Sequence, residues 1–451
     1  MPETVYTYLK FVRYRELENW SVSHILVMNM GFNEMYPMIP IGNTIVRSAN
    51  TINIEDDVSY KQVTLKTNGG GAVLRDIKQG KYIGTKKQFV VHSGQFIMSK
   101  IDARNGAFGV VNADLDGAVV TADFPVFDVL NEKVTPEYLA LISSTTQFVR
   151  FAQSCSRGTT NRQRIDVGLF LSQKIPLPTI DEQRTLVSAY NEKIGESKKL
   201  EQQAARIEQE IEDYLLTELG IEKQTEAKVG NANKYLQFYR FKDIDKWGYD
   251  FIIKRKHIKK NEKYHTKTIS QLCQISSGGT PARGRKEYYG GTIPWIKTGE
   301  LQNEILLDTE EKITKLGLEN SSAKLYSEGS LVVAMYGATI GKTAKLGIKA
   351  TTNQACAVLS NIDNSIVETD YLWVYIQSQT KELKTLAYGG AQPNINAGII
   401  ANYKIPIPPL AVQNTIVEHI NKQKGQIKKL KQQAEYLRKE ALEEFEKEIF
   451  E

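Results

Sequence analysis

The sequence predicts an α+β fold made of two tandem β-rich domains, each followed by one long helix. Three observations predict it. A segment near the end of the first half recurs 230 residues later, short β-branched runs broken by glycine fill the interior of each half, and a long heptad pattern closes each half. A chain of 451 residues is long enough for two or three domains.

The internal repeat is clearest before and along the predicted helices. Lys174–Gln183 recurs as Lys404–Gln413, and the register then holds without a gap. The openings match as well, with Phe11–Trp20 over Phe238–Trp247 at an offset of 227. Because this period far exceeds the ~20–50 residues of a solenoid repeat, it predicts a tandem pair of domains. The offset drifts between these segments, so the interiors of the two halves have diverged.

Strand-like runs lie in the interior of both halves, between turns that contain glycine such as Ser93-Gly94 and Asn105-Gly106. The predicted strands are Phe89–His92, Gln95–Met98, Ala118–Thr121, Ser330–Tyr336 and Ala355–Leu359. Each half therefore reads as a β-rich domain.

Two helices are predicted after the Pro-x-Pro pairs. The prolines favour an extended segment, because proline disfavours helix in the residue before it. Thr179 is a plausible N-cap with Glu182 three positions later, which is the capping-box pattern. A helix of about 39 residues at ~1.5 Å per residue is ~58 Å long.

The apolar positions of both helices follow heptad spacing, and those of the second helix equal those of the first plus 230. The predicted seam residues are Leu186, Tyr190, Leu200, Ala204, Ile207, Ile211, Ile416, Ile420, Ile427, Leu430, Ala434 and Leu437. A narrow stripe cannot be buried by a lone helix, so we expect an intramolecular coiled coil, antiparallel in direction. The alternative is that each helix packs on its own domain.

The predicted domain order follows from these elements. The ranges are 1–180 for the first β-rich domain, 181–219 for the first helix, 220–234 for a linker, 235–408 for the second β-rich domain and 409–451 for the second helix.

The bulk composition limits the classes of function. The net charge of +6 and the pI near 8.8 permit nucleic-acid binding without requiring it. No apolar stretch approaches ~18 residues and no signal peptide opens the chain, so we expect a cytoplasmic protein. Three dispersed cysteines predict buried free thiols, and no metal site is expected.

Catalytic motifs are incomplete. Gly337–Thr343 resembles a phosphate-binding loop, but it has three residues between its glycines where four are needed. Glu310–Lys312 has the Glu-x-Lys spacing of a nuclease without an upstream Pro-Asp, and solvated acid–lysine pairs produce that spacing routinely. The chain is therefore not expected to be an enzyme.

Glycine-rich loops with basic residues recur in both halves and favour DNA binding. Glycine lets the backbone approach a phosphate, while arginine and lysine supply charge and base-edge donors. The candidate DNA-binding residues are Lys100, Arg104, Arg157, Arg162, Arg164, Arg283, Arg285, Lys297 and Lys342. For each loop alone, an ordinary solvated loop remains the alternative.

At these loops and in several further motifs, the chain resembles the DNA specificity (S) subunits of type I restriction-modification enzymes. The motifs in the second half are Ser277–Pro281, Ile293–Glu300, Ala334–Gly341, Thr352–Ala355 and Ile405–Gln413. The first half has Ala103–Gly109 and Ile175–Gln183 but lacks the Gly-Gly-Thr-Pro and Pro-Trp segments. The resemblance extends over roughly residues 10–450.

The resemblance implies two target recognition domains that each read half of a split site in double-stranded DNA, with helices acting as a ruler. It also implies two methyltransferase subunits and ATP-dependent restriction subunits as partners. S-adenosylmethionine, ATP and Mg²⁺ would then bind to those partners and not to this chain.

Three other interpretations stay open. The chain could be the recognition module of another restriction or methylation assembly whose catalytic domains lie on a separate chain. It could be a stand-alone nuclease or NTPase. It could also be a coiled-coil scaffold that never meets DNA, which would leave the divergent loop-rich interiors unexplained.

Overall fold

The computed structural model describes residues 35–67, 69–157, 164–221, 263–389 and 393–450. The chain forms two compact units. The first unit consists of residues 1–201 and 431–451, and the second of residues 202–430. The openings of the sequence repeat and residues 222–234 of the predicted linker lie outside the described residues. None of the described helices has a stretch that is long and apolar enough to cross a bilayer.

The first unit contains a five-stranded and a four-stranded sheet. The five-stranded sheet has the order β3 (Thr51–Asn53), β6 (Lys87–Val91), β9 (Ala118–Val120), β4 (Ser59–Leu65), β5 (Ala72–Gln79). The four-stranded sheet has the order β2 (Ile45–Arg47), β10 (Val126–Val129), β7 (Phe96–Met98), β8 (Phe108–Val110). The three strands predicted for this half correspond to β6, β7 and β9.

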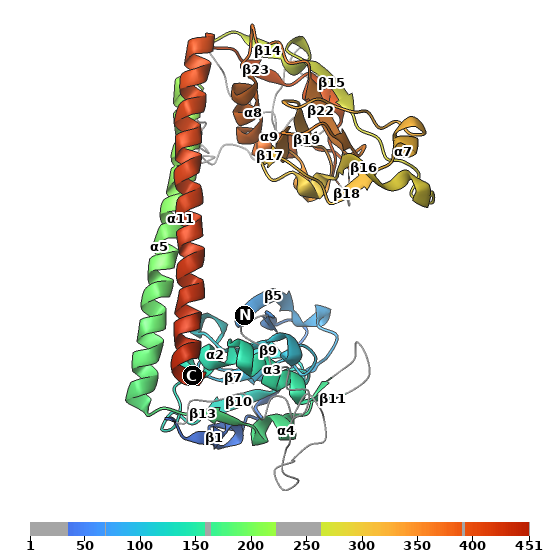
Figure 1. Cartoon of the computed structure of the whole chain (residues 1–451). Coiled ribbons are helices and arrows are strands. Elements are labelled where there is room, and N and C mark those ends of the chain that lie inside the picture. Colours follow the sequence, from blue (N-terminus) through green and yellow to red (C-terminus); the bar gives the residue numbers. More distant parts are fainter. Residues whose placement is uncertain (1–34, 68, 158–163, 222–262, 390–392, 451) are drawn as a thin grey trace, which may run out of the picture. The chain divides into compact units, whose positions relative to one another are not determined.

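In its described part, the first unit also contains three short helices, α2 (Pro136–Ser143), α3 (Thr146–Ser154) and α4 (Val167–Ser172) (Figure 1). Buried aromatic rings join them to the four-stranded sheet. Phe108 on β8 lies 5.2 Å from Phe148 on α3, edge to face, and 5.8 Å from Phe170 on α4, measured between ring centroids. These geometries are the favourable ones for aromatic pairs.

The second unit contains a five-stranded and a three-stranded sheet. The five-stranded sheet has the order β15 (Gln274–Ser277), β22 (Cys356–Ser360), β19 (Leu331–Ala334), β20 (Thr343–Leu346), β17 (Glu304–Leu306). The three-stranded sheet has the order β18 (Glu311–Ile313), β16 (Tyr289–Ile296), β21 (Thr351–Thr352). The strands predicted at Ser330–Tyr336 and Ala355–Leu359 correspond to β19 and β22.

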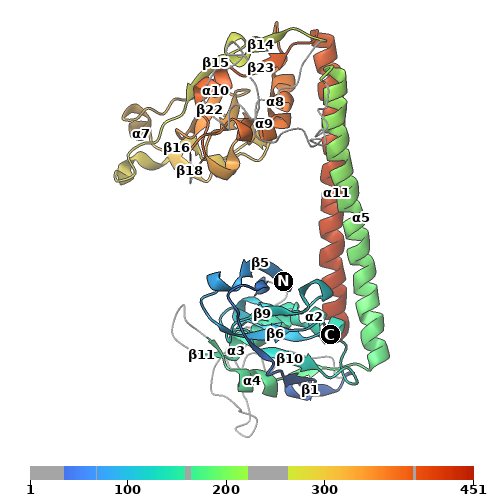
Figure 2. The ribbon, with the colours of Figure 1, turned by 180° about the vertical axis from the view of Figure 1, so that it is seen from behind.

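Helices α7 (Lys315–Glu319), α8 (Thr369–Ser378), α9 (Thr380–Thr385) and α10 (Ala397–Ala401) belong to this unit. Figure 2 shows α8 and α9 beside the sheet that contains β22. Tyr371 and Leu372 of α8 share one hydrophobic core with Leu331, Val333 and Leu359 of that sheet. One hydrophobic core of the second unit therefore lies between α8 and the five-stranded sheet.

The segment that resembles a phosphate-binding loop is a connection between antiparallel strands. A short 3-10 turn at Gly337–Thr339 follows β19, and strand β20 begins at Thr343 where a nucleotide-binding loop would continue into a helix. Gly341 adopts φ +80°, in the left-handed region that favours glycine. The glycines therefore serve the turn between β19 and β20.

Two long helices follow the Pro-x-Pro segments. Helix α5 spans Ile180–Glu218, and α11 spans Leu410–Phe450. The predicted capping box is present, because the backbone N–H of Thr179 donates to Glu182 Oε2 (2.8 Å) while that of Glu182 donates to Thr179 Oγ1 (3.4 Å). This start matches the sequence prediction to within one residue.

Within each unit, one part of α5 contacts one part of α11. In the first unit Lys193 pairs with Glu440 (2.8 Å) and Glu444 (2.6 Å), and Ser197 Oγ donates to the backbone carbonyl of Ala434 (2.9 Å). Ser197 follows Lys193 in α5, whereas its partner Ala434 precedes Glu440 and Glu444 in α11. The two segments are therefore antiparallel in this unit.

The second unit shows the same direction. Ala204 and Ile207 of α5 form an apolar cluster with Ile427 of α11. Further along, the ring of Tyr214 stacks on that of His419 with 4.0 Å between centroids. These contacts again join rising numbers on α5 to falling numbers on α11.

The predicted seam residues are buried to different degrees. Ala204, Ile207, Ile416, Ile420, Ile427 and Ala434 are buried, and Leu186, Tyr190, Leu200, Ile211, Leu430 and Leu437 are partly buried. Leu186 and Tyr190 pack on the core of the first unit, and Ile416 and Ile420 belong to the core of the second. Helix-to-helix and helix-to-domain contacts therefore both occur, in different stretches of the two helices.

Candidate nucleic-acid interface

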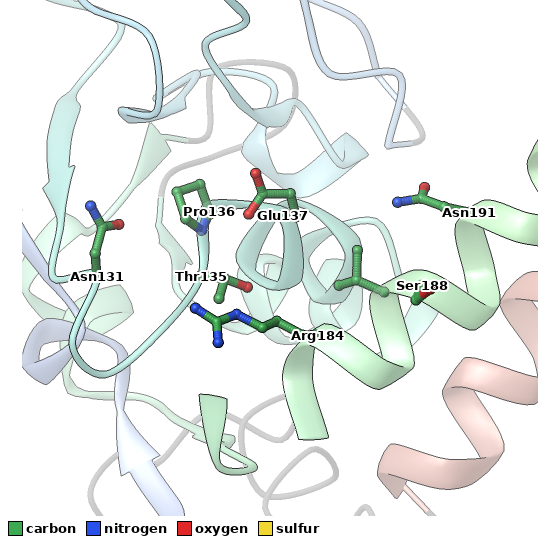
Figure 3. Close-up of a pocket in the computed structure, with 8 residues that line it drawn as sticks. Asn131, Thr135, Pro136, Glu137, Arg184, Ser188 and Asn191 are labelled. Atoms are coloured by element: carbon green, nitrogen blue, oxygen red, sulfur yellow. The ribbon is translucent and has the colours of Figure 1, made fainter. Parts of the chain in front are cut away.

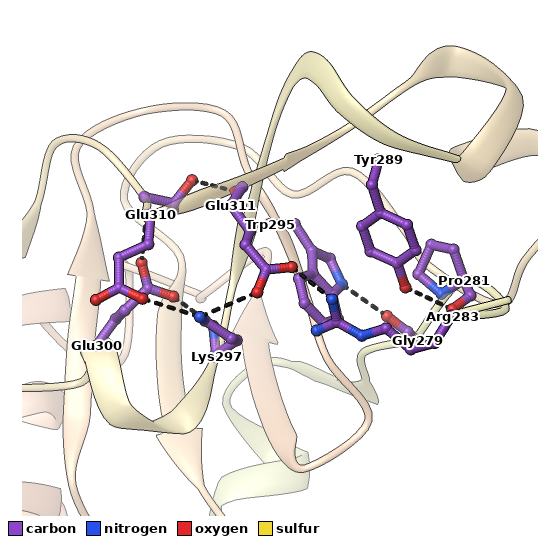
Figure 4. A network of polar contacts seen from close by, with 10 residues as sticks. Gly279, Pro281, Arg283, Tyr289, Trp295, Lys297, Glu300, Glu310 and Glu311 are labelled. Atoms are coloured by element: carbon purple, nitrogen blue, oxygen red, sulfur yellow. Dashed lines mark hydrogen bonds and ion pairs between the residues drawn. The ribbon is translucent and has the colours of Figure 1, made fainter. Parts of the chain in front are cut away.

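The best-defined cationic site in the second unit is built around Arg283, in the loop between β15 and β16. Its guanidinium lies 4.7 Å from the ring centroid of Tyr289 and 4.8 Å from that of Trp295, at cation–π distance. Its Nη1 also contacts Glu311 Oε2 at 2.6 Å (Figure 4). The hydrogen bond to Glu311 raises the pKa of Arg283. The side chain is thus held in one direction although it is half exposed.

Lys297 extends the same network. Its Nζ lies 2.9 Å from Glu310 Oε2 and 3.1 Å from Glu311 Oε1. Hydrogen bonds to Glu310 and then Glu311 raise the pKa of Lys297, and the hydrogen bond from Arg283 lowers the pKa of Glu311. A third carboxylate, that of Glu300, accepts from the backbone N–H groups of Lys297 (2.7 Å) and Glu310 (2.9 Å).

Strand register brings these residues together. In the antiparallel pair β16·β18, Trp295 lies opposite Glu311, which places the carboxylate beside the ring that Arg283 covers. Trp295 is fully buried, and its Nε1 donates to the carbonyl of Gly279 (2.9 Å). Tyr289 Oη donates to the carbonyl of Pro281 (2.6 Å). Both aromatic residues therefore fix the loop that carries Arg283.

Glycine is required in this loop for packing. A Cβ at Gly279 would lie 2.2 Å from the backbone N of Ala323, and one at Gly278 would lie 2.3 Å from the carbonyl oxygen of Asn353. Real Cβ atoms do not approach backbone so closely. The Ser277–Pro281 motif therefore serves the loop's attachment to the domain.

The other two predicted cations of the second unit lie apart from this network. Arg285 is exposed and lies 3.5 Å from Glu287. Lys342 is partly buried in the connection between β19 and β20, where its carbonyl accepts from the backbone N–H of Ala334 (2.8 Å). Among the residues that the structure describes, Lys342 makes no ion pair.

In the first unit, backbone hydrogen bonds bring Lys100 and Arg164 together. The N–H of Ile165 donates to the carbonyl of Lys100 (2.9 Å), and the N–H of Lys100 donates to that of Asp123 (2.8 Å). Arg164 Nη1 lies 3.3 Å from the carboxylate of the same Asp123. The carbonyl of Arg104 accepts from Gln153 Nε2 (2.9 Å), which ties the 99–106 loop to α3.

Strands β11 (Ser156–Arg157) and β12 (Arg164–Ile165) pair so that Arg157 lies opposite Arg164. Arg162 lies outside the described residues. The structure thus places Lys100, Arg157 and Arg164 in neighbouring segments of the first unit.

Sequence reasoning missed a buried glutamine at the start of each long helix. Gln183 is fully buried, and its Nε2 donates to the carbonyls of Lys133 (3.0 Å) and Pro178 (2.9 Å). Its Oε1 accepts from the backbone N–H of Thr135 (2.8 Å), the N-cap of α2. One side chain therefore ties the first turn of α5 to the β-rich domain.

Gln413 does the same in the second unit. Its Nε2 donates to the carbonyls of Ile366 (3.1 Å) and Pro408 (2.8 Å), and its Oε1 accepts from the backbone N–H of Glu368 (2.7 Å), the N-cap of α8. It is also fully buried. The repeat aligned Gln183 with Gln413, which was the only sequence signal of this role.

A buried tyrosine accompanies each glutamine. Tyr138 Oη donates to the carbonyl of Pro176 and Tyr371 Oη to that of Pro406, both at 2.8 Å. Burial raises the pKa of both tyrosines. We call each glutamine and tyrosine together the helix clamp of its unit.

The accepting prolines end two equivalent strands. Strand β13 (Lys174–Pro176) pairs with β1 (Met38–Pro40), and β23 (Lys404–Pro406) pairs with β14 (Thr266–Thr268), both antiparallel. The two units thus share the same attachment between domain and helix.

A cavity of about 550 Å³ lies beside the clamp of the first unit, between the N-terminus of α2 and the first turns of α5. Arg184, Ser188 and Asn191 line it from α5, and Thr135 and Glu137 line it from α2 (Figure 3). Arg184 pairs with Asp181 (3.2 Å) on its own helix. The cavity is open to solvent, and its lining is mixed in polarity.

A family model matches the second of these two units. Residues 261–436 match the model described as "Type I restriction modification DNA specificity domain". This part of the chain is therefore similar to the DNA specificity domain of type I restriction-modification enzymes. It contains the Arg283 network and the clamp of Gln413.

Curated relatives extend the likeness beyond this part of the chain. The chain is 25% identical over 379 residues to the specificity subunit of the type I restriction enzyme HindI from Haemophilus influenzae. The aligned region covers 74% of this chain and 81% of the relative. It is 27% identical over 162 residues to the EcoR124I/EcoR124II specificity subunit of Escherichia coli, covering 35% of this chain and 40% of the relative. The resemblance inferred from the sequence motifs is therefore confirmed.

The fold is shared with a solved structure. A chain from a study of complex assembly and conformational transition of the type I R-M system superposes with a TM-score of 0.55 at 18% identity, covering 92% of this chain and 97% of that chain. The α+β class, with β-rich domains and long helices, is confirmed. The homologues of this chain are specificity subunits. The prediction that the chain is a DNA-recognition subunit and not an enzyme is therefore also confirmed.

Proposed function

We propose that this chain recognises an asymmetric, bipartite site in double-stranded DNA for a type I restriction-modification complex. The observation that carries the proposal is the repetition of the helix clamp. The specificity-domain match covers only the second half, but the first unit has the same strand pair and the same glutamine and tyrosine hydrogen bonds. Two related recognition domains with different interiors would read two different half-sites.

We further propose that α5 and α11 form one continuous antiparallel coiled coil that sets the distance between the half-sites. The antiparallel contacts found within each unit support this pairing. A helix of 39 residues is ~58 Å long at ~1.5 Å per residue, enough for half-sites one DNA turn (~34 Å) apart.

The partners in this proposal are two methyltransferase subunits and, for cleavage, restriction subunits. S-adenosylmethionine, ATP and Mg²⁺ would bind to those partners. The alternative is a recognition module in a different restriction or methylation assembly, with its catalytic domains on a separate chain. Identifying the proteins that copurify with the tagged chain separates the two.

Arg104 and Arg283 test the DNA contacts of the two domains. If the arginine reads a base, Arg104→Ala or Arg283→Ala should relax the sequence specificity at one half-site and leave the other half-site unchanged. A good bidentate base contact contributes ~1–3 kcal/mol of discrimination. Loss of a phosphate contact would instead weaken binding at all sequences. Genome-wide mapping of methylated bases with the reconstituted complex distinguishes these results.

Lys315→Ala is the matched control, because Lys315 is an exposed cation of the second unit and, among the described residues, its ion pair is with Glu319 on its own helix at 3.7 Å. It should leave the methylated sequence unchanged. If both arginine variants methylate and bind as the unaltered protein does, the chosen contacts are wrong.

A further inference from the structure

The charge balance around Arg283 and Lys297 is the opposite of what a simple phosphate-binding patch requires. Two cations lie among the carboxylates of Glu300, Glu310 and Glu311, so the network carries one net negative charge (Figure 4). Glu311 contacts both cations, one with each carboxylate oxygen. A DNA phosphate that approaches Arg283 or Lys297 therefore meets a carboxylate already in place.

The two carboxylates are accessible to different degrees. The side chain of Glu310 is 73% exposed, and that of Glu311, which contacts both cations, is 33% exposed. Ion pairs at solvent-exposed positions contribute little to stability, so a phosphate can displace a carboxylate without disrupting the domain. The displaced carboxylate would then lie close to the phosphate, and like-charge repulsion would lower the net gain.

We propose that Glu310 and Glu311 are specificity-determining residues that restrain non-specific DNA binding by the second domain. The inference rests on the proposed function. Non-specific binding depends almost entirely on cations that neutralise phosphates, whereas a specific complex gains base contacts as well. Carboxylates that pair with the cations therefore lower the affinity for non-specific DNA more than the affinity for the specific site. The ratio of the two affinities, which is the specificity, therefore rises.

The double variant Glu310→Gln/Glu311→Gln tests this directly. Glutamine keeps the shape and an acceptor oxygen, so the Arg283 loop keeps its aromatic contacts while the two negative charges are lost. We expect tighter binding to a random-sequence duplex. The plot of log affinity against log salt should steepen by up to ~0.9 for each cation released to a phosphate. Per released cation, the loss of affinity between ~50 and ~200 mM salt would be roughly threefold larger.

The measurement is fluorescence anisotropy of labelled duplexes with the full chain assembled with its methyltransferase subunits, over a salt series. One duplex carries the methylated sequence found by mapping, and one has a random sequence. Glu319→Gln is the matched control, because it frees the exposed Lys315 of the same unit from its ion pair. It should change neither the affinity nor the salt slope. Glu310→Gln alone, which keeps the bond of Glu311 to Arg283, should give a smaller effect in the same direction.

Three outcomes separate the claims. If the unaltered complex binds its site and the double variant shows unchanged affinity and slope on random DNA, the inference is wrong and the proposed function stands. If the double variant loses its own site with no gain on random DNA, the carboxylates contribute to recognition and do not restrain binding. If the unaltered complex prefers no duplex at any salt concentration, the proposed function fails, and the inference fails with it.

Discussion

Gln413→Leu should destabilise the second unit by about 3–4 kcal/mol, because the substitution leaves several buried polar groups without partners. The glutamine is fully buried and makes three hydrogen bonds to backbone groups of Ile366, Pro408 and Glu368. Leucine has a similar volume but can satisfy none of them. For a unit of this size the expected fall in Tm is about 6–16 °C.

Differential scanning calorimetry of the full chain measures this effect. Gln426→Leu is the matched control, because Gln426 is exposed on the same helix. It should shift the Tm by little, as surface substitutions change stability by about 0.5 kcal/mol or less. Equal Tm values for the two variants would show that the hydrogen bonds of Gln413 contribute no stability. Gln183→Leu should act in the same way on the first unit.

Insertion of one heptad into both long helices should change the gap between the two methylated half-sites or abolish methylation. The insertion points are after Leu200 in α5 and after Leu430 in α11, which are equivalent positions of the sequence repeat. Seven residues add ~10.5 Å of helix, about three base pairs of DNA. The heptad keeps the apolar seam on one face, so the pairing of the helices is preserved.

The longer coiled coil also changes which side of the DNA helix lies opposite the displaced domain. Three base pairs rotate the duplex by roughly 100°, given about 10.5 base pairs per turn. A flexible complex would therefore methylate a site with a longer gap, and a rigid one would lose activity. An insertion of seven residues into a single helix is the control, since it misaligns the seam and should lower thermal stability. If the variant with both insertions still methylates the original motif, the two long helices do not set the distance between the half-sites.

The elements predicted from the sequence are those specified by local patterns. The β-branched runs at Phe89–His92 and Ser330–Tyr336 are strands, and the capping box at Thr179 and Glu182 starts α5. The near match to a phosphate-binding loop fails on the number of residues between its glycines and on the sequence that follows it, and β20 follows it where a helix would be needed. Periodicity and capping act within a few residues, so they can be read without tertiary structure.

The clamps and the charge network could not be predicted, because their partners are distant in the chain. Gln413 meets residues 45 and 47 positions away. Lys297 and Glu311 are 14 residues apart and meet through the register of β16 and β18. The sequence identified Arg283 and Lys297 as cations in glycine-rich loops. It could not show that carboxylates already hold them.

The most direct test of the central claim is genome-wide mapping of methylated bases in cells that express this chain with its methyltransferase subunits. We expect methylation at one asymmetric motif of two specified half-sites separated by a gap of fixed length. Methylation at this motif should disappear when the chain is deleted. Methylation that is unaffected by the deletion, or a motif that is continuous, would contradict it.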